Sequence, residues 1–284
     1  MPAAPLQIRE LMVNGLRCPL LEGAPAGADP AEAVVCVHGN PGSSHDWEQL
    51  AGAIAGFARV VALDMPGFGR ADKPADFPYT VQGYAAHLGA ALEALGIRRA
   101  HLVLHDFGGP WGLAWAAGQP QALGSLTLID TGYLPDYRWH ILARIWRTPL
   151  LGELFQAVST RPAFHRLIQR GNPRGLPREF VDRMFDDYDA GTRRAILRLY
   201  RATGDADRMS RDLAPAFAGL RLPTLAIWGG HDPYIDARYA QRQRELMPDA
   251  QVHVLDDSGH WPFADNPQAV EALVTPFLRG CFGV

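Results

Sequence analysis

Short apolar runs alternate with longer stretches of helical periodicity through the first 131 residues. The runs have few polar residues on either face, which is typical of strands buried on both sides in a parallel sheet. Residues 80–96 favour a helix that ends at Gly96. The apolar runs are AVVCVHG, RVVALDMPG, AHLVLHD and SLTLID, and each ends in glycine or an acid.

Other parts of the chain show different patterns of apolar and polar residues. The segment Leu6–Gly23 predicts a hairpin that turns at Asn14-Gly15, a pair that tolerates the positive φ of a tight turn. From residue 132 to 212 the strand pattern is lost, and helical periodicity is broken by prolines. Strands return in LPTLAIWGG and AQVHVLDD, and a last helix is expected over 266–279.

These patterns predict an α/β fold with a mostly parallel sheet flanked by helices and an inserted helical cap. The predicted parts are a first core segment at 1–131, the cap at 132–212 and a second core segment at 213–284. A helical block inserted between strands of one sheet covers the edge at which open α/β sheets bind ligands. We therefore expect a small-molecule site between sheet and cap.

Composition narrows the class of protein. The 284 residues are 48% hydrophobic, enough for one full-sized core. The net charge is −3 and the 27 basic residues are scattered, so we expect neither a nucleic-acid partner nor a membrane surface. Cys18, Cys36 and Cys281 lack metal-ligand spacing, and no export signal or apolar run of about 20 residues is present, so we expect a reduced, cytoplasmic protein. The pattern leaves the oligomeric state open.

The stretch LVLHDFGGPWG has the outline of a nucleophile elbow, a strand-turn-helix device with small residues on either side of an exposed nucleophile. Its central residue is Asp106, where most elbows carry serine. Gly108 and Gly109 satisfy the second half of the pattern, whereas Leu104 departs from the first half. Taken alone, the motif leaves a second interpretation, in which Asp106 caps the helix that begins near Gly108.

Two later segments favour the elbow. SGHWPF places His260 after the last strand, and WGGHDPYID places Asp232 after the preceding strand. This chain order of nucleophile, acid and histidine is the order that the elbow architecture requires. VHGNPGSS adds a backbone N–H at Asn40, which together with the N–H of Phe107 is predicted to form an oxyanion hole.

The segments VHGNPGSSHDW, LDMPGFGRADKP, LVLHDFGG, WGGHDPYID and SGHWPF spread over most of the chain. As a set they resemble the α/β-hydrolase branch that contains epoxide hydrolases and haloalkane dehalogenases. The resemblance implies the α/β-hydrolase fold and a catalytic set of Asp106, Asp232 and His260. It also makes Asp130, at the end of LTLID, an alternative acid, because some dehalogenases take their acid from the end of this strand.

A carboxylate nucleophile selects the reaction. It is ionised at neutral pH and suits displacement at a saturated carbon, so its targets carry a C–O or C–halogen bond. The product is an alkyl ester of Asp106, which His260, held by Asp232, resolves by activating water. This chemistry requires no cofactor and no metal.

Some residues around the nucleophile are typical of haloalkane dehalogenases and others of epoxide hydrolases. Dehalogenase relatives hold the halide with a side chain equivalent to Asn40 and a tryptophan directly after the nucleophile, but Phe107 has no ring N–H. Trp139 or Trp146 compensates only if it points into the pocket. Epoxide hydrolase relatives protonate the opening ring with cap tyrosines, and we expect Tyr200 to have this role. The other cap tyrosines are Tyr133, Tyr137 and Tyr188.

The aromatic residues near these motifs indicate an uncharged, largely apolar substrate. Relatives that act on fluoroacetate carry arginines where this chain has Phe107 and Pro110, so small halo-acids are not expected. The sequence therefore favours an epoxide hydrolase, with a haloalkane dehalogenase, another α/β hydrolase or a non-catalytic binding protein as alternatives. The predicted substrate-binding residues are Trp47, Trp111, Trp139 and Trp261, with Phe107 and Phe263 beside them.

Overall fold

The computed structural model describes residues 5–284, which form an eight-stranded sheet in the order β1-β2-β4-β3-β5-β6-β7-β8. β1 pairs with β2, and β2 with β4, in antiparallel fashion, and every other pairing is parallel. The predicted mostly parallel sheet is confirmed. The strands are β1 (Gln7–Val13), β2 (Leu16–Gly23), β3 (Glu32–Val37), β4 (Val60–Leu63), β5 (Arg99–His105), β6 (Leu123–Ile129), β7 (Thr224–Gly229) and β8 (Gln251–Leu255).

The continuous apolar runs form the buried centre of this sheet. Every residue of β4, β6 and β7 is buried, as expected for strands that are covered on both faces. The hairpin between β1 and β2 turns at Asn14 and Gly15, whose φ angles are 50° and 81°. These positive angles explain the choice of an Asn-Gly pair at this turn.

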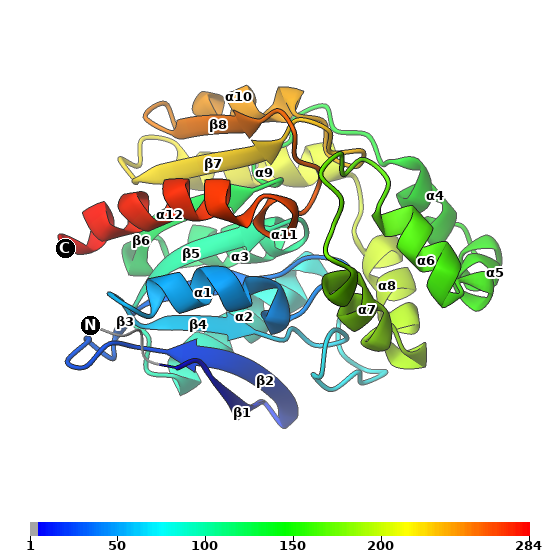
Figure 1. Cartoon of the computed structure of the whole chain (residues 1–284), viewed down its shortest axis with the longest axis horizontal. Helices are drawn as coiled ribbons and strands as arrows, with labels where there is room; N and C mark the ends of the chain where they lie inside the picture. Colours follow the sequence, from blue (N-terminus) through cyan, green and yellow to red (C-terminus); the bar gives the residue numbers. More distant parts are fainter. Residues whose placement is uncertain (1–4) are drawn as a thin grey trace.

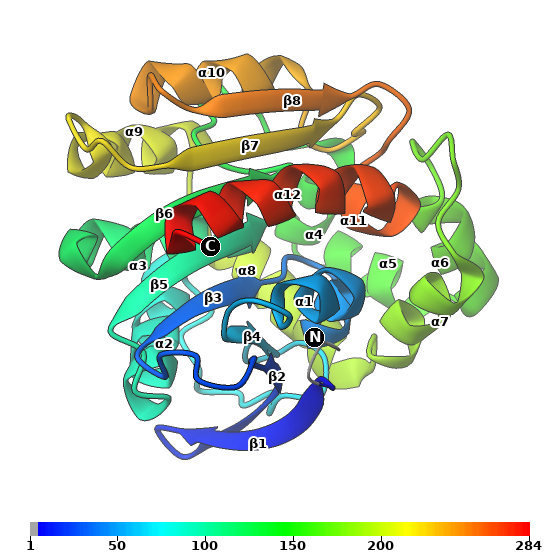
Figure 2. The ribbon, with the colours of Figure 1, turned by 60° about the vertical axis from the view of Figure 1, so that its left-hand side comes forward.

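Helices cover both faces of the sheet. Figure 2 shows α1 and α12 on one face, where they contact each other, while α2 and α3 pack together on the other. No helix of residues 5–284 is both long and apolar enough to cross a membrane. The helices of this part are α1 (Glu48–Ile54), α2 (Val81–Ala94), α3 (Gly108–Gly118), α10 (Arg238–Leu246), α11 (Pro262–Asp265) and α12 (Pro267–Phe282), with 3-10 turns η1 (Ser44–Trp47) and η2 (Pro120–Ala122).

A run of helices occupies the chain between β6 and β7. Figure 1 shows α4–α8 gathered at one end of the sheet, and α9 lies against α3. The last of them, α9, continues past residue 212 to Phe217, which is buried, and it accommodates Pro215 in its last turn. These helices are α4 (Ile141–Arg147), α5 (Leu151–Val158), α6 (Arg161–Ile168), α7 (Arg178–Asp186), α8 (Ala190–Ala202) and α9 (Ala206–Phe217).

Candidate active site

The turn after β5 holds Asp106 in a left-handed conformation, with φ 47°. The backbone packs so closely here that a Cβ on Gly39 would collide with Asp106, and a Cβ on Gly108 would collide with the carbonyl of Val37. The first position of the elbow is not small, but Leu104 fits because Gly112, one turn into α3, leaves room for it. The tight strand-turn-helix geometry of an elbow is therefore present.

The Asp106 side chain does not cap α3. The N-cap of that helix is Phe107, and no side chain caps its first turn. Instead, Asp106 Oδ1 accepts a hydrogen bond from the backbone N–H of Asn40, at 2.7 Å. The interpretation of this stretch as an ordinary capped turn thus disagrees with the geometry, and the carboxylate lies against one of the two predicted oxyanion-hole amides.

His260 joins Asp106 to Asp232. Its Nδ1 is 2.6 Å from Asp232 Oδ2, and its Nε2 is 3.5 Å from Asp106 Oδ2. The other oxygen of Asp232 accepts the N–H groups of Tyr234 and Ile235, at 2.7 and 3.0 Å, so the loop itself aims this carboxylate at the histidine. Three segments far apart in the sequence thus bring the predicted nucleophile, histidine and acid into one chain of contacts.

His105, which the sequence analysis did not identify, positions His260 through its backbone. The Nε2–H of His105 donates to the backbone carbonyl of His260, at 2.8 Å, and the two rings lie 4.7 Å apart. His105 is buried. A polar residue that follows the apolar run at residues 102–104, directly before the elbow aspartate, was the available signal.

The charges in this cluster stabilise one another. Burial alone would raise the pKa of Asp106, but the hydrogen bond and charge of His260 outweigh it and lower that pKa to about 2. Burial alone would lower the pKa of His260, but the charges of Asp232 and Asp106 outweigh it and raise that pKa well above its usual value. At neutral pH the resting site therefore holds an Asp106 carboxylate beside a protonated His260.

Asp130, the alternative acid, lies next to this cluster without direct contact to the histidine. Its Oδ1 accepts the N–H of Gly229, at 2.9 Å, and its buried Oδ2 has no partner among residues 5–284. Burial and the charge of Asp232 raise the pKa of Asp130 well above its usual value, which favours its protonated form. The geometry favours Asp232 as the acid that orients His260.

Among the described residues, Asp130, Asp232 and His260 lie close enough together to be considered as ligands of one metal ion. One ligand atom each from Asp130, Asp232 and His260 lies within 4.8 Å of the others. However, a 2.6 Å hydrogen bond already joins His260 to Asp232, and burial raises the pKa of Asp130, which disfavours the carboxylate that a cation would need. These donors fit a hydrogen-bonded acid and histidine better than a cation site.

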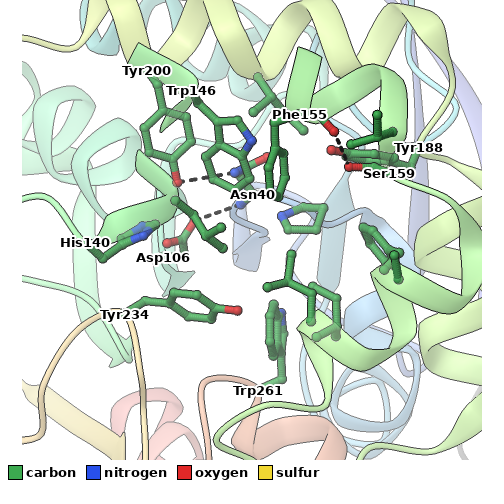
Figure 3. A pocket seen from close by; sticks show the side chains of 18 residues that line it. Asn40, Asp106, His140, Trp146, Phe155, Ser159, Tyr188, Tyr200, Tyr234 and Trp261 are labelled. Carbon is green, nitrogen blue, oxygen red and sulfur yellow. Dashed lines mark hydrogen bonds between the residues drawn. The ribbon is translucent and has the colours of Figure 1, made fainter. Parts of the chain in front are cut away.

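Tyr200, on α8, faces the nucleophile from the inserted helices. It is buried and accepts a hydrogen bond from Asn40 Nδ2, at 3.3 Å, while no acceptor among residues 5–284 receives its own O–H (Figure 3). Burial and the charge of Asp106 raise the pKa of Tyr200 well above its usual value, so the phenol keeps its proton. Two of the other cap tyrosines differ, since Tyr188 donates to Gln156 and Tyr137 to the carbonyl of Tyr234, and the third, Tyr133, lines the second cavity.

Two cavities reach Asp106. The first lies between the β3 loop and helices α4, α5, α6 and α8, and the second lies between α3, α9 and the segment after β6. Apolar side chains dominate the lining of both. The first is lined by Asn40, Pro41, Asp106, His140, Leu142, Trp146, Phe155, Val158, Ser159, Ala163, Phe164, Leu167, Ile168, Tyr188, Ile196, Tyr200, Tyr234 and Trp261 (Figure 3).

Only some of the predicted aromatic residues line these cavities. Trp261 lines the first and Trp139 the second, together with Phe107. Trp47 and Trp111 line neither cavity, contrary to expectation. Trp47 is fully buried against Phe263, and Trp111 stacks on Tyr84 at 4.0 Å, inside the core.

His140 and Tyr234 line the first cavity as well, and sequence reasoning missed both. His140 Nδ1 accepts the N–H of Ala143 at the start of α4, which leaves the ring proton on Nε2. Burial lowers the pKa of His140 to about 4, so the ring is neutral at neutral pH. His140 belongs to no recognisable motif, whereas Tyr234 lies inside WGGHDPYID, two residues after Asp232, and that position was the available signal.

The chain belongs to the α/β hydrolase family. The family described as alpha/beta hydrolase fold matches residues 32–267, which include the elbow, Asp232 and His260. A similar protein is the cis-3-alkyl-4-alkyloxetan-2-one decarboxylase of Shewanella oneidensis, 31% identical over 264 residues that cover 87% of this chain and 82% of the relative.

Solved structures agree on the fold. The haloalkane dehalogenase DbeA from Bradyrhizobium elkani aligns with a TM-score of 0.83 and 24% identity, covering 98% of this chain and 99% of that one. The epoxide hydrolase CorEH aligns with a TM-score of 0.81 and 18% identity, covering 97% and 99%. At these identities the likeness concerns the fold, and the reaction has to be argued from the site.

Proposed function

We propose that this protein is a hydrolase that opens an epoxide through a covalent ester on Asp106. The observation that carries the proposal is a buried phenol, Tyr200, that keeps its proton and shares Asn40 with the nucleophile. An opening epoxide needs a carboxylate on the ring carbon and an acid on the ring oxygen at the same moment. This site offers both.

In the first step, Asp106 Oδ2 attacks a ring carbon. The carbon–oxygen bond of the ring breaks, and the oxygen takes the proton of Tyr200. The Asn40 N–H holds Asp106 Oδ1, so the second oxygen is the one left to attack. The tyrosinate then recovers a proton from protonated His260, whose pKa falls once esterification removes the negative charge of Asp106.

In the second step, neutral His260 takes a proton from water, which adds to Cγ of the ester. The oxyanion forms on Oδ1, where Asn40 N–H already donates and where the N–H of Phe107 is the second predicted donor. The ester bond then breaks, and the leaving alkoxide takes the second proton of the added water from the new hydroxyl on Cγ. A diol leaves, and the Asp106 carboxylate again lies beside protonated His260. Both protons of water are accounted for: one replaces the proton that His260 gave to Tyr200, and the other completes the diol.

The role of Tyr200 can be tested by removing its hydroxyl. The Tyr200→Phe variant should lose roughly 10²-fold in kcat on styrene oxide, the usual effect of removing a positioned acid. Tyr188→Phe, in the wall of the same cavity, is the matched control and should lose little. Full activity in Tyr200→Phe would remove this residue from the mechanism.

The charge state of Asp106 makes a prediction on pH. Ester formation should stay constant from about pH 8 down to about pH 4, because the pKa of Asp106 is lowered to about 2 and the carboxylate stays ionised. Rapid-quench mass spectrometry of the ester measures this rate, with circular dichroism at each pH to confirm that the chain stays folded. A decline centred near the ordinary carboxyl pKa would contradict the proposed Asp106–His260 ion pair.

Dehalogenation is supported less well. Phe107 offers no ring N–H, and Trp139 Nε1 donates to the carbonyl of Gly204. Trp146 and Trp261 line the first cavity, each with an Nε1 unpartnered within residues 5–284, so Asn40 and these two tryptophans are candidate halide donors. If 1-bromobutane releases bromide, Asn40→Ala should abolish that release, as measured with a halide assay. Release that survives would assign the halide to the two tryptophans.

A strained lactone ring is the second candidate substrate. The support is the 31% identity to a cis-3-alkyl-4-alkyloxetan-2-one decarboxylase. An oxetan-2-one ring also has a saturated carbon open to Asp106, but its leaving group is a carboxylate that needs no proton. The bond from that carboxylate to the neighbouring ring carbon then breaks to release CO2, its electrons form an alkene, and the Asp106 carboxylate is expelled. Release of CO2 from a cis-3,4-dialkyloxetan-2-one, little affected in Tyr200→Phe, would favour this candidate over the epoxide.

A further inference from the structure

The two cavities share three wall residues, Asp106, His140 and Tyr200. The nucleophile and the proposed acid therefore lie where the cavities approach each other, and space extends from them in two directions. One direction leads between α4, α5, α6 and α8. The other leads behind Phe107, between α3 and α9. A reacting group at Asp106 thus has two separate spaces beside it.

The two spaces differ in size. The volume in which the centre of a water-sized sphere fits is about 210 Å³ in the first cavity and about 50 Å³ in the second. Both exceed the roughly 10–15 Å³ that a single water needs. Val158, in the wall of the first cavity, is 61% exposed.

The second cavity suits an alkyl group. Its wall is largely apolar and includes Leu113, Leu134, Met209, Leu213 and Phe217. The flexible side chain of a methionine adapts to apolar ligands of different shape. No lysine, arginine or glutamate lines it, and its acid is Asp106 itself. Apolar space of this kind stabilises a bound chain by removing it from water.

We propose that the second cavity binds a short alkyl substituent, so that the substrate carries apolar groups on both sides of the reacting ring. The longer group occupies the first cavity and the shorter one the second. The preferred substrate is then an internal, unequally disubstituted small ring rather than a terminal one. This inference rests on the proposed function for the reacting group and on the two cavities for the substituents.

Two isomeric ketones test the two-sided site without any reaction. In 4-undecanone the carbonyl lies between a propyl and a heptyl group, and in 2-undecanone between a methyl and a nonyl group. With the carbonyl at Tyr200, the methyl group of 2-undecanone would leave the second cavity largely unfilled, whereas the propyl group of 4-undecanone would occupy it. We expect 4-undecanone to bind about tenfold more tightly by calorimetry. Equal affinity, or no binding of 4-undecanone, would overturn the inference.

A matched pair of variants assigns the effect to the second cavity. Ala206→Leu places three more carbons in its wall, and Ala163→Leu makes the same change in the wall of the first. Ala206→Leu should reduce the preference for 4-undecanone to within about twofold, whereas Ala163→Leu should keep it. If Ala206→Leu does not unfold cooperatively, Met209→Trp takes its place. A preference that survives filling of the second cavity contradicts the proposal.

Isomeric epoxides separate this inference from the proposed function. cis-4,5-Epoxydecane should have a kcat/KM about tenfold above that of 1,2-epoxydecane, with the gap lost in Ala206→Leu. Consumption of both at equal rates, together with equal ketone affinities, would leave the epoxide hydrolase standing and overturn the two-sided site. A ketone preference without turnover of either epoxide would support the two-sided site and overturn the proposed reaction.

Discussion

The His260→Gln variant, mixed with an epoxide that the parent enzyme consumes, should accumulate a covalent adduct on Asp106. The carboxylate is ionised without help from the histidine, whereas hydrolysis of the ester needs a base for water, so the cycle should stop after its first half. Intact-protein mass spectrometry should show one added substrate equivalent, which maps to the peptide containing HDFGG. Turnover should fall roughly 10⁵-fold or more.

The matched control is Asp106→Ala, which should show neither adduct nor turnover. Asp106 lies between Gly39 and His260, and alanine at this position removes the carboxylate together with its hydrogen bond to Asn40 and its contact with His260. An unmodified His260→Gln protein, with a substrate that the parent consumes, would mean that Asp106 is not the nucleophile. So would residual turnover by Asp106→Ala at the parent rate.

The second large effect concerns the acid. Asp232→Asn should lower kcat by roughly 10³-fold or more, because the amide cannot stabilise the imidazolium of His260 and favours the wrong tautomer. The 2.6 Å contact between Asp232 Oδ2 and His260 Nδ1 is the interaction that is lost. Steady-state kinetics on styrene oxide measures the change.

Asp130→Asn is the control for this substitution. Burial raises the pKa of Asp130 and favours its protonated form, so an amide of the same shape should cost less than about tenfold in kcat. If the two variants exchange their effects, Asp130 is the acid that serves the histidine. The two residues follow neighbouring strands, β6 and β7, so the comparison makes the same change of side chain at almost the same place.

Local signals in the sequence account for the correct parts of the predicted fold and site. Glycines around Asp106 are required because the backbone of the elbow passes against β3, and that requirement leaves a readable motif. Asp232 and His260 each follow a strand of the parallel sheet, and the carboxyl ends of such strands meet at one edge. Their proximity to Asp106 follows from chain order and sheet topology together.

Side-chain direction is not a local property, and the predictions that depended on it differ from the structure. Trp111 lies one turn after the elbow, yet the face of α3 that carries it packs on Tyr84 in the core. Trp47 is equally close to a motif and lies against Phe263. A tryptophan near a motif therefore does not indicate a pocket wall unless the packing around it is known.

The sequence by itself determined the parallel sheet, the strained aspartate and the order of nucleophile, acid and histidine, because each depends on residues that are neighbours along the chain or on strand order. Only the tertiary structure decided that Tyr200 and His140 face Asp106 and that space extends from it in two directions. The physical reason is that cavities are what packing leaves unfilled between helices far apart in sequence. Their shape depends on how α3, α8 and α9 settle against one another, which no single segment specifies.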